Sequence, residues 1–123
     1  MDLDQLESSD KILEQFGRQI LVPGIDEEGQ VTLSKRKICI IGLGALGTIA
    51  SQYLVRSGIG QISLIDPDKI EESNIHRQVN YDLDDIGKLK AEVSYKKLKK
   101  INHLAKISYF SEIFENYIQK NIE

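Results

Sequence analysis

The stretch ICIIGLGALG, Ile38–Gly47, decides how the rest of this sequence is interpreted. Its first four residues are apolar on both alternating faces, which is typical of a parallel strand that helices cover on both sides. Glycines follow at 42, 44 and 47, and from Ala45 to Ser57 the apolar residues recur at helical spacing. The sequence therefore predicts a strand in the middle of a sheet, a tight glycine turn and a helix.

The segments that follow this stretch alternate between helix and strand. Strands are predicted at residues 61–66 and 105–110, and further helices at 88–102 and 111–123. The order strand, helix, strand, helix, strand is that of one half of a doubly wound sheet with right-handed crossovers. The predicted fold class is α/β: the N-terminal half of a Rossmann-like parallel sheet, with about three strands and flanking helices.

Short helices are expected ahead of this sheet, at residues 11–19 and 26–36. The second has acids in its first turn and bases in its last, as the helix dipole prefers. We therefore divide the chain into an N-terminal helical segment, residues 1–36, and a Rossmann-like nucleotide-binding half domain, residues 37–123.

Two expectations concern packing around the glycine turn. Cys39, the only cysteine, lies inside the apolar strand, so we expect it to be buried as a small hydrophobe. A single cysteine excludes disulfides within the chain and cysteine-based metal clusters. The helix over 45–57 carries one apolar stripe that should face the sheet, made of Leu46, Ile49, Ala50, Tyr53 and Leu54.

Composition and charge narrow the range of partners. The chain has 123 residues, of which 41% are hydrophobic and 28% charged, as in a single globular domain. Its net charge of -3 argues against nucleic acid and anionic membranes as partners. No apolar run approaches the roughly 20 residues that span a bilayer, and the first residues do not resemble a signal peptide. We therefore expect a cytoplasmic protein.

The first chemical motif is GLGALG, residues 42–47, which fits GxGxxG between a strand and a helix. Glycine there permits the turn, the approach of phosphate to the backbone, and close packing of helix on sheet. Asp66 ends the second strand 19 residues after Gly47, where a carboxylate can accept hydrogen bonds from ribose hydroxyls. The motif predicts nucleotide binding, and the alternative is a scaffold whose glycines serve only packing.

The second motif is SNIHRQVN, Ser73–Asn80, which supplies Asn74, Arg77 and Gln78 soon after the acid. Lys90 follows at the start of the next helix. Several cationic and amide donors near a glycine turn suit three phosphates better than two. The extra charge needs compensation, and a leaving pyrophosphate must be held.

Five stretches then combine into a more specific pattern: FGRQILVPG, IGLGALG, LIDPDKIEESNIHRQ, IGKLKAE and LKKIN, in that order. Together they resemble the ThiF/MoeB/HesA family, the bacterial relatives of the ubiquitin-activating enzymes, from about Ile12 to the end of the chain. The resemblance implies the N-terminal, ATP-binding portion of such an enzyme. Members bind Mg-ATP and adenylate the C-terminal glycine carboxylate of a ubiquitin-like sulfur carrier, releasing pyrophosphate.

The resemblance also implies roles for individual residues. Arg18 would reach the ATP of a partner subunit, which makes the expected active unit a homodimer. Such an arginine would stabilise the charge that grows as the adenylate forms, and Arg77 and Lys90, in contact with the phosphates, complete the expected catalytic set. The residues implied to contact the nucleotide are Gly42, Gly44, Ala45, Gly47, Asp66, Ser73, Asn74, Arg77 and Lys90.

Some parts of the family pattern do not occur in this sequence, namely the Asp that positions magnesium and the two CxxC pairs that hold zinc in many members. We expect ligands for either metal only beyond Glu123. The first strand would be an edge strand in a sheet ordered third, second, first. Its apolar residues predict that a neighbour covers this open edge, either further chain or a second copy.

Two alternative functions stay open. The chain could be a catalytically inactive nucleotide-binding or interaction module of the same family. It could also be an NAD- or FAD-binding Rossmann domain, in which Arg18, Arg77 and Lys90 would be solvated surface charges.

Overall fold

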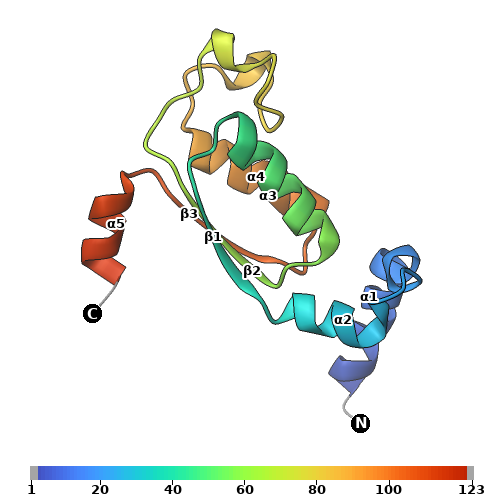
Figure 1. Cartoon of the computed structure of the whole chain (residues 1–123). Helices are drawn as coiled ribbons and strands as arrows, with labels where there is room; N and C mark the ends of the chain where they lie inside the picture. The colour runs from blue at the N-terminus through green and yellow to red at the C-terminus, as the bar shows by residue number, and fades with distance from the viewer. Residues whose placement is uncertain (1–2, 122–123) are drawn as a thin grey trace.

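The polypeptide forms one parallel sheet with helices on one of its faces and at its ends (Figure 1). The structure, a computed structural model, describes residues 3–121, with side chains from residue 10 onward. Its elements are α1 (Leu3–Ile20), α2 (Asp26–Ser34), β1 (Lys37–Ile41), α3 (Ala45–Ser57), β2 (Gln61–Ile65), the 3-10 turns η1 (Glu72–Asn74) and η2 (Leu83–Asp85), α4 (Lys90–Ile101), β3 (Lys106–Phe110) and α5 (Phe114–Asn121).

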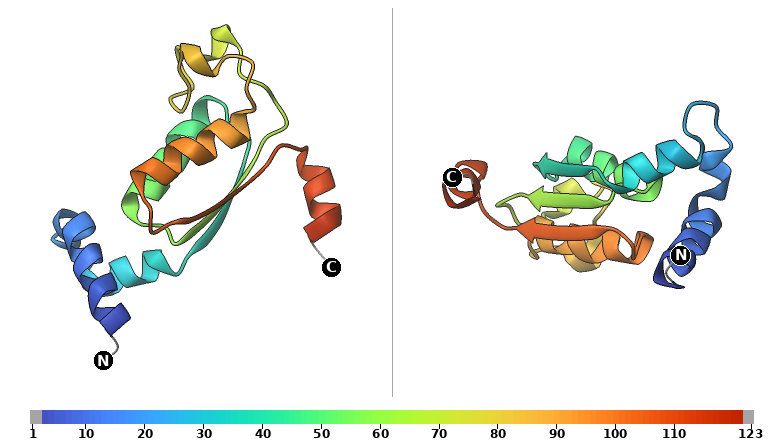
Figure 2. Two further views of the ribbon diagram at one scale, coloured as in Figure 1. Left: turned by 180° about the vertical axis from the view of Figure 1, so that it is seen from behind. Right: turned by 90° about the horizontal axis from the view of Figure 1, so that it is seen from below.

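The sheet has the order β1-β2-β3, with both pairs parallel. Ile40 lies beside Leu64, which in turn lies beside Tyr109. Helices α3 and α4, the two crossovers, lie side by side on one face (Figures 1 and 2). The predicted α/β class, the parallel sheet and the edge position of the first strand are confirmed.

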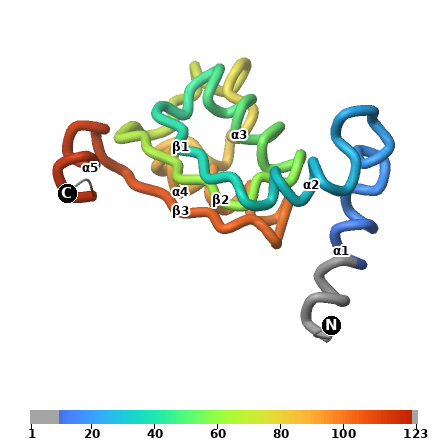
Figure 3. Tube along the Cα trace, turned by 60° about the horizontal axis from the view of Figure 1, so that its bottom comes forward, coloured from blue at the N-terminus to red at the C-terminus, as the bar shows by residue number. Residues whose placement is uncertain are grey.

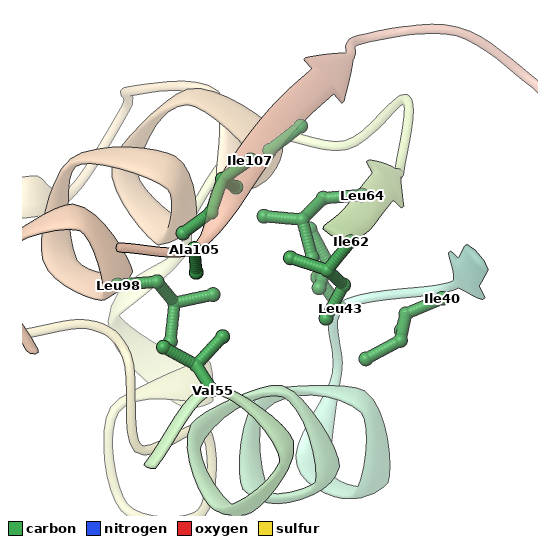
Figure 4. Packing of buried hydrophobic residues seen from close by; sticks show 9 residues of the cluster. Ile40, Leu43, Val55, Ile62, Leu64, Leu98, Ala105 and Ile107 are labelled. Carbon is green, nitrogen blue, oxygen red and sulfur yellow. The ribbon is translucent and has the colours of Figure 1, made fainter. Parts of the chain in front are cut away.

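The main core lies between the sheet and these two helices (Figure 4). Its buried members are Ile40, Leu43, Val55, Ile62, Leu64, Ala91, Leu98, Ala105 and Ile107. A second, smaller cluster of Ile70, Tyr81 and Val93 holds the long connection between β2 and α4. The main core extends along the length of the sheet, and the smaller cluster lies beyond its carboxyl end, within the connection and the start of α4.

The predicted burial of Cys39 is wrong, since its side chain is exposed. Cys39 lies in register with Ser63, which pairs with Ser108, so these three residues share the face of the sheet opposite α3 and α4. On that face Ile41 is 55% exposed. Within residues 3–121 both crossover helices lie on one side, so the expectation of helices on both faces of β1 is also wrong.

Helix α3 has the predicted bounds but packs through a different face. Thr48, Ser51 and Val55 are buried, whereas Leu46 is 85% and Tyr53 is 72% exposed. The predicted apolar stripe therefore faces largely outward. An exposed apolar surface of this kind is typical of a contact with another protein surface.

Thr48 and Ser51 can be buried because their hydroxyls bond within the helix. The Thr48 hydroxyl donates to the Gly44 carbonyl at 2.6 Å, and the Ser51 hydroxyl donates to the Thr48 carbonyl at 2.8 Å. A buried hydroxyl with a partner avoids most of the cost of desolvation. The short side chains also let α3 lie close to the sheet.

Helices α1 and α2 pack on each other at the amino ends of the strands, and α5 lies at the opposite end of the molecule (Figure 3). Gln19 and Gln30 both donate to the Ser57 carbonyl, at 2.8 and 3.0 Å, which fastens the N-terminal helices to the end of α3. Helix α1 is longer than predicted, because it begins at Leu3. Residues 3–10, which precede the predicted helix, contain no glycine or proline that would break it. The division at residue 36 stays a prediction.

Candidate functional site

The candidate site lies where β1 and β2 end. The glycine turn follows β1, Asp66 follows β2, and Gly42 N–H donates to the Ile65 carbonyl at 2.8 Å, which joins the two strand ends. In open parallel sheets, ligands bind at the carboxyl ends of the strands. The structure thus places the first chemical motif at the carboxyl end of the sheet, where ligands bind in such folds.

The three glycines of the turn differ in what surrounds them. Gly42 has a φ of 89°, a conformation that side chains disfavour. A Cβ on Gly47 would lie 1.8 Å from the Gly42 carbonyl oxygen, so only glycine fits there. A Cβ on Gly44 would meet only the side-chain nitrogen of Gln78, at 3.7 Å. Gly42 and Gly47 therefore build the turn, and Gly44 faces the segment that carries the second motif.

The amino terminus of α3 has no side-chain cap. Gly44 occupies the N-cap position, with no side chain to accept from the first amides of the helix that begins at Ala45. Uncapped N–H groups and the positive end of the helix dipole favour an anion at this position. The turn can therefore receive a phosphate.

Asp66 connects the two strand ends through its carboxylate. Its side chain is 5% exposed; Oδ2 accepts from Leu43 N–H at 2.7 Å, and Oδ1 accepts from Asp68 N–H at 2.7 Å. These bonds hold the carboxylate in one orientation. Because each carboxylate oxygen has a further lone pair, Asp66 can still accept from a ribose hydroxyl.

The second motif lies in the connection between β2 and α4. Asn74 is buried, and its amide oxygen accepts from Glu71 N–H at 2.9 Å, which shapes the turn η1. Arg77 is exposed, and its guanidinium donates to the Ser73 carbonyl at 2.7 Å. This bond uses one guanidinium nitrogen, so Arg77 keeps further donors for an anion.

Gln78 and Lys90 carry polar groups that lack a protein partner. Gln78 is 4% exposed, and its amide oxygen has no hydrogen bond in the described part of the chain. Lys90 is 7% exposed, and between residues 10 and 121 its ammonium has no hydrogen bond and no acidic partner. Its backbone N–H donates to the Asp68 carbonyl at 3.0 Å, which ties the start of α4 to the segment that follows β2. The stem of Lys90 is buried while its ammonium keeps contact with solvent, so the charge is available to an anionic ligand.

Arg18 does not belong to this group within one chain. It is exposed on α1, and its neighbour Gln19 bonds to Ser57 at the end of α3. The 13 residues of α3 separate Ser57 from Gly44, which corresponds to about 20 Å. Figure 1 shows α1 beyond the amino ends of the strands, on the side away from the glycine turn.

Tyr81 is a site residue that sequence reasoning missed. It is 5% exposed, and its hydroxyl donates to the Leu43 carbonyl of the glycine turn at 2.7 Å. The Ser94 hydroxyl donates to the Tyr81 oxygen at 3.3 Å, and the Asn80 amide donates to Ser94 at 3.0 Å and to Ser51 at 3.2 Å. No motif identifies a tyrosine whose partner lies 38 residues away.

The buried hydroxyl of Tyr81 should make the free energy of unfolding decrease at alkaline pH. Burial raises the pKa of Tyr81 above its usual value of 10.0, with Asp66 and other nearby carboxylates adding to the rise and the hydrogen bond from Ser94 opposing it. The folded state therefore keeps the proton that the unfolded state loses above about pH 10, so stability decreases there. We expect this loss to reach about 1.4 kcal/mol per pH unit beyond that of Tyr81→Phe, measured by urea unfolding from about pH 9 to 11. If the free energy of unfolding falls with pH equally steeply in the wild type and in Tyr81→Phe, Tyr81 is not the group responsible.

The described residues hold neither a candidate metal site nor a membrane-spanning helix. No group of three or more His, Cys, Asp or Glu side chains among them could hold a metal ion. No helix among residues 3–121 is both long enough and apolar enough to cross a bilayer.

Comparisons with known proteins identify the family of this chain. Residues 16–123 match the ThiF family. The chain is 37% identical, over 98 residues, to the sulfur carrier protein adenylyltransferase of Thermus thermophilus, which covers 80% of this chain and 36% of that protein. It is 39% identical, over 118 residues, to the adenylyltransferase and sulfurtransferase uba4 of Aspergillus niger, which covers 88% of this chain and 24% of that protein. The chain therefore spans well under half the length of either relative.

A solved structure supports the same assignment. The crystal structure of Escherichia coli tRNA N6-threonylcarbamoyladenosine dehydratase, TcdA, in complex with ATP, is 30% identical to this chain with a TM-score of 0.80. The similarity covers 88% of this chain and 44% of that chain. Because the family match extends over most of its residues, the chain belongs to the ThiF family.

Proposed function

We propose that this chain is the ATP-binding part of an adenylyltransferase that activates the C-terminal carboxylate of a ubiquitin-like sulfur carrier. The observation that carries the proposal is the uncapped start of α3 beside the fixed carboxylate of Asp66, together with the ammonium of Lys90, which makes no ion pair within the described residues. The relatives from Thermus and Aspergillus are adenylyltransferases, and the Thermus protein is named for a sulfur carrier.

In this proposal, each group of the candidate site has a role in holding ATP. The start of α3 at Gly44 and Ala45 receives a phosphate, and Asp66 accepts from the ribose. Ser73, Asn74, Arg77 and Lys90 contribute donors or positive charge around the phosphates. Gly42 and Gly47 maintain the turn on which the rest depends.

The proposed reaction needs little covalent chemistry from the protein. A carboxylate oxygen of the carrier attacks the α-phosphorus, the bond to the bridging oxygen breaks, and pyrophosphate leaves with the electron pair. The product is an acyl-adenylate. Arg77 and Lys90 compensate the charge that develops on the phosphate oxygens, and the fixed turn holds the reacting groups in line.

The proposal is tested by calorimetry of Mg-ATP binding, with NAD as the comparator and Arg77→Ala as the variant. We expect stoichiometric ATP binding, little NAD binding, and about tenfold weaker ATP binding in Arg77→Ala, because a charge-assisted hydrogen bond is lost. Tighter binding of NAD would overturn the proposal. ATP binding without ATP–pyrophosphate exchange in the presence of a carrier would instead assign a nucleotide-binding module.

We further propose that the active unit is a homodimer in which Arg18 reaches the ATP of the partner. The distance of Arg18 from its own glycine turn and the exposed apolar side chains of α3, Leu46 and Tyr53, support this proposal.

The test is to mix two inactive variants of the protein that carries this chain, Arg18→Ala and Lys90→Ala. A mixed dimer has one site with both residues intact, so we expect activity to return to about a quarter of the wild-type value, as random pairing with one working site per mixed dimer predicts. Size-exclusion chromatography checks that dimers exchange. If exchange occurs and the mixture stays inactive, Arg18 does not act across the dimer.

A further inference from the structure

The peptide group between Leu43 and Gly44 lies at the centre of the glycine turn and is held from one side. Its carbonyl oxygen accepts from the Tyr81 hydroxyl at 2.7 Å. The preceding peptide is held as well, because Leu43 N–H donates to Asp66 at 2.7 Å. Leu43 is fully buried, so both bonds are shielded from water.

The orientation of this carbonyl determines where the next N–H points. In a planar trans peptide, the C=O and N–H bonds point in opposite directions. Since the Leu43 carbonyl points toward Tyr81, the Gly44 N–H points away from Tyr81. That N–H has no hydrogen-bond acceptor in the described part of the chain and lies at the uncapped start of α3.

Glycine makes this orientation dependent on a restraint. Gly44 has no Cβ to restrict its own φ, so no side chain at this position fixes the orientation of the adjoining peptide. A rotated peptide would direct a carbonyl oxygen, which repels phosphate, to the place where the N–H now lies. The Tyr81 hydroxyl opposes this rotation.

We propose that Tyr81 is a positioning residue for the phosphate site: its hydroxyl, through the Leu43 carbonyl, keeps the Gly44 N–H directed at a phosphate group of the nucleotide. The inference rests on the proposed function, since it specifies how that site recognises ATP. Ser94 and Asn80 support the arrangement, because Ser94 donates to Tyr81 and Asn80 donates to Ser94.

The substitution Tyr81→Phe tests this proposal because it removes the hydroxyl and keeps the ring among Ile70 and Val93. The matched control is Tyr95→Phe, which removes a hydroxyl from a partly buried tyrosine on α4 that packs on Tyr109. Thermal unfolding of both variants establishes that each is folded under the conditions of the binding experiment.

The measurement is a titration of the ¹⁵N-labelled chain with Mg-ATP, followed by NMR at the Gly44 amide. In the wild type and in Tyr95→Phe we expect a large ATP-induced shift of the Gly44 resonance. In Tyr81→Phe we expect most of that shift to disappear and the dissociation constant to rise about tenfold, as for the loss of one hydrogen bond to a charged group. The Gly58 amide, at the far end of α3, should stay unchanged in all three.

The outcomes separate this inference from the function on which it rests. A wild-type chain that does not bind Mg-ATP overturns both. A wild-type chain that binds, together with a folded Tyr81→Phe that binds equally and shows the same Gly44 shift, overturns the role of Tyr81 alone. Equal loss of affinity in Tyr95→Phe would also overturn it, since the effect would then not be specific to the Leu43 carbonyl.

Discussion

Replacing Lys90 with methionine is expected to weaken Mg-ATP binding about 10- to 150-fold, the worth of a charge-assisted hydrogen bond to phosphate, while leaving the fold intact. Lys90 is 7% exposed, and its ammonium has no acidic partner in the part of the chain that the structure describes. Methionine keeps most of the buried stem and removes a charge that makes no ion pair within the described residues. Stability and affinity should therefore respond in different ways to one substitution.

Calorimetry measures the affinity for Mg-ATP, and urea unfolding without nucleotide measures the stability. The matched control is Lys100→Met, an exposed lysine on the same helix, which should change neither quantity. Equal ATP affinity in wild type and Lys90→Met would remove Lys90 from the site. A large loss of stability in Lys90→Met would show instead that the ammonium supports the fold.

The second large effect is expected from Gly47→Ala, which should lower the free energy of unfolding by about 3 kcal/mol or more, as overpacking against rigid backbone does. The added Cβ would lie 1.8 Å from the Gly42 carbonyl oxygen and 2.9 Å from its carbonyl carbon. Neither atom can move without opening the turn that joins β1 to α3. Thermal or urea unfolding gives the measurement.

Two alanine substitutions serve as controls for Gly47→Ala. Gly44→Ala adds a methyl group in the same turn, but its nearest neighbour is a side-chain nitrogen at 3.7 Å, so the fold should tolerate it. Gly17→Ala adds a methyl group on α1 with nothing within 4 Å, and should stabilise that helix slightly. If all three variants unfold alike, close packing at Gly47 does not account for the effect.

The sequence was sufficient for the part of the fold that depends on local pattern. The bounds of α3 and the position of Asp66 after the second strand follow from residues close together in the chain. The packing face of α3 does not, because Thr48 and Ser51 bond to carbonyls of their own helix and are buried at little cost. Hydropathy marks such residues as exposed, and here it placed the apolar stripe on the wrong side.

The remaining differences arise from contacts between distant parts of the chain. Burial of Cys39 depends on which elements cover each face of the sheet, and a strand's own residues do not specify that. Tyr81 could not be found because its partner, Leu43, belongs to another motif. Arg18 was recognised from its motif, but only the bond from Gln19 to Ser57 shows how far it lies from the glycine turn of its own chain.

The two hydrogen bonds that Leu43 makes, one with Asp66 and one with Tyr81, affect the rate at which the nucleotide associates. A glycine-rich loop that must close around its ligand adds a slow step and loses conformational entropy when it orders. Here the turn is already restrained on both sides of Leu43. Association of ATP should therefore proceed in a single phase whose rate rises linearly with nucleotide concentration, and differences in affinity among variants should appear mainly in the rate of dissociation.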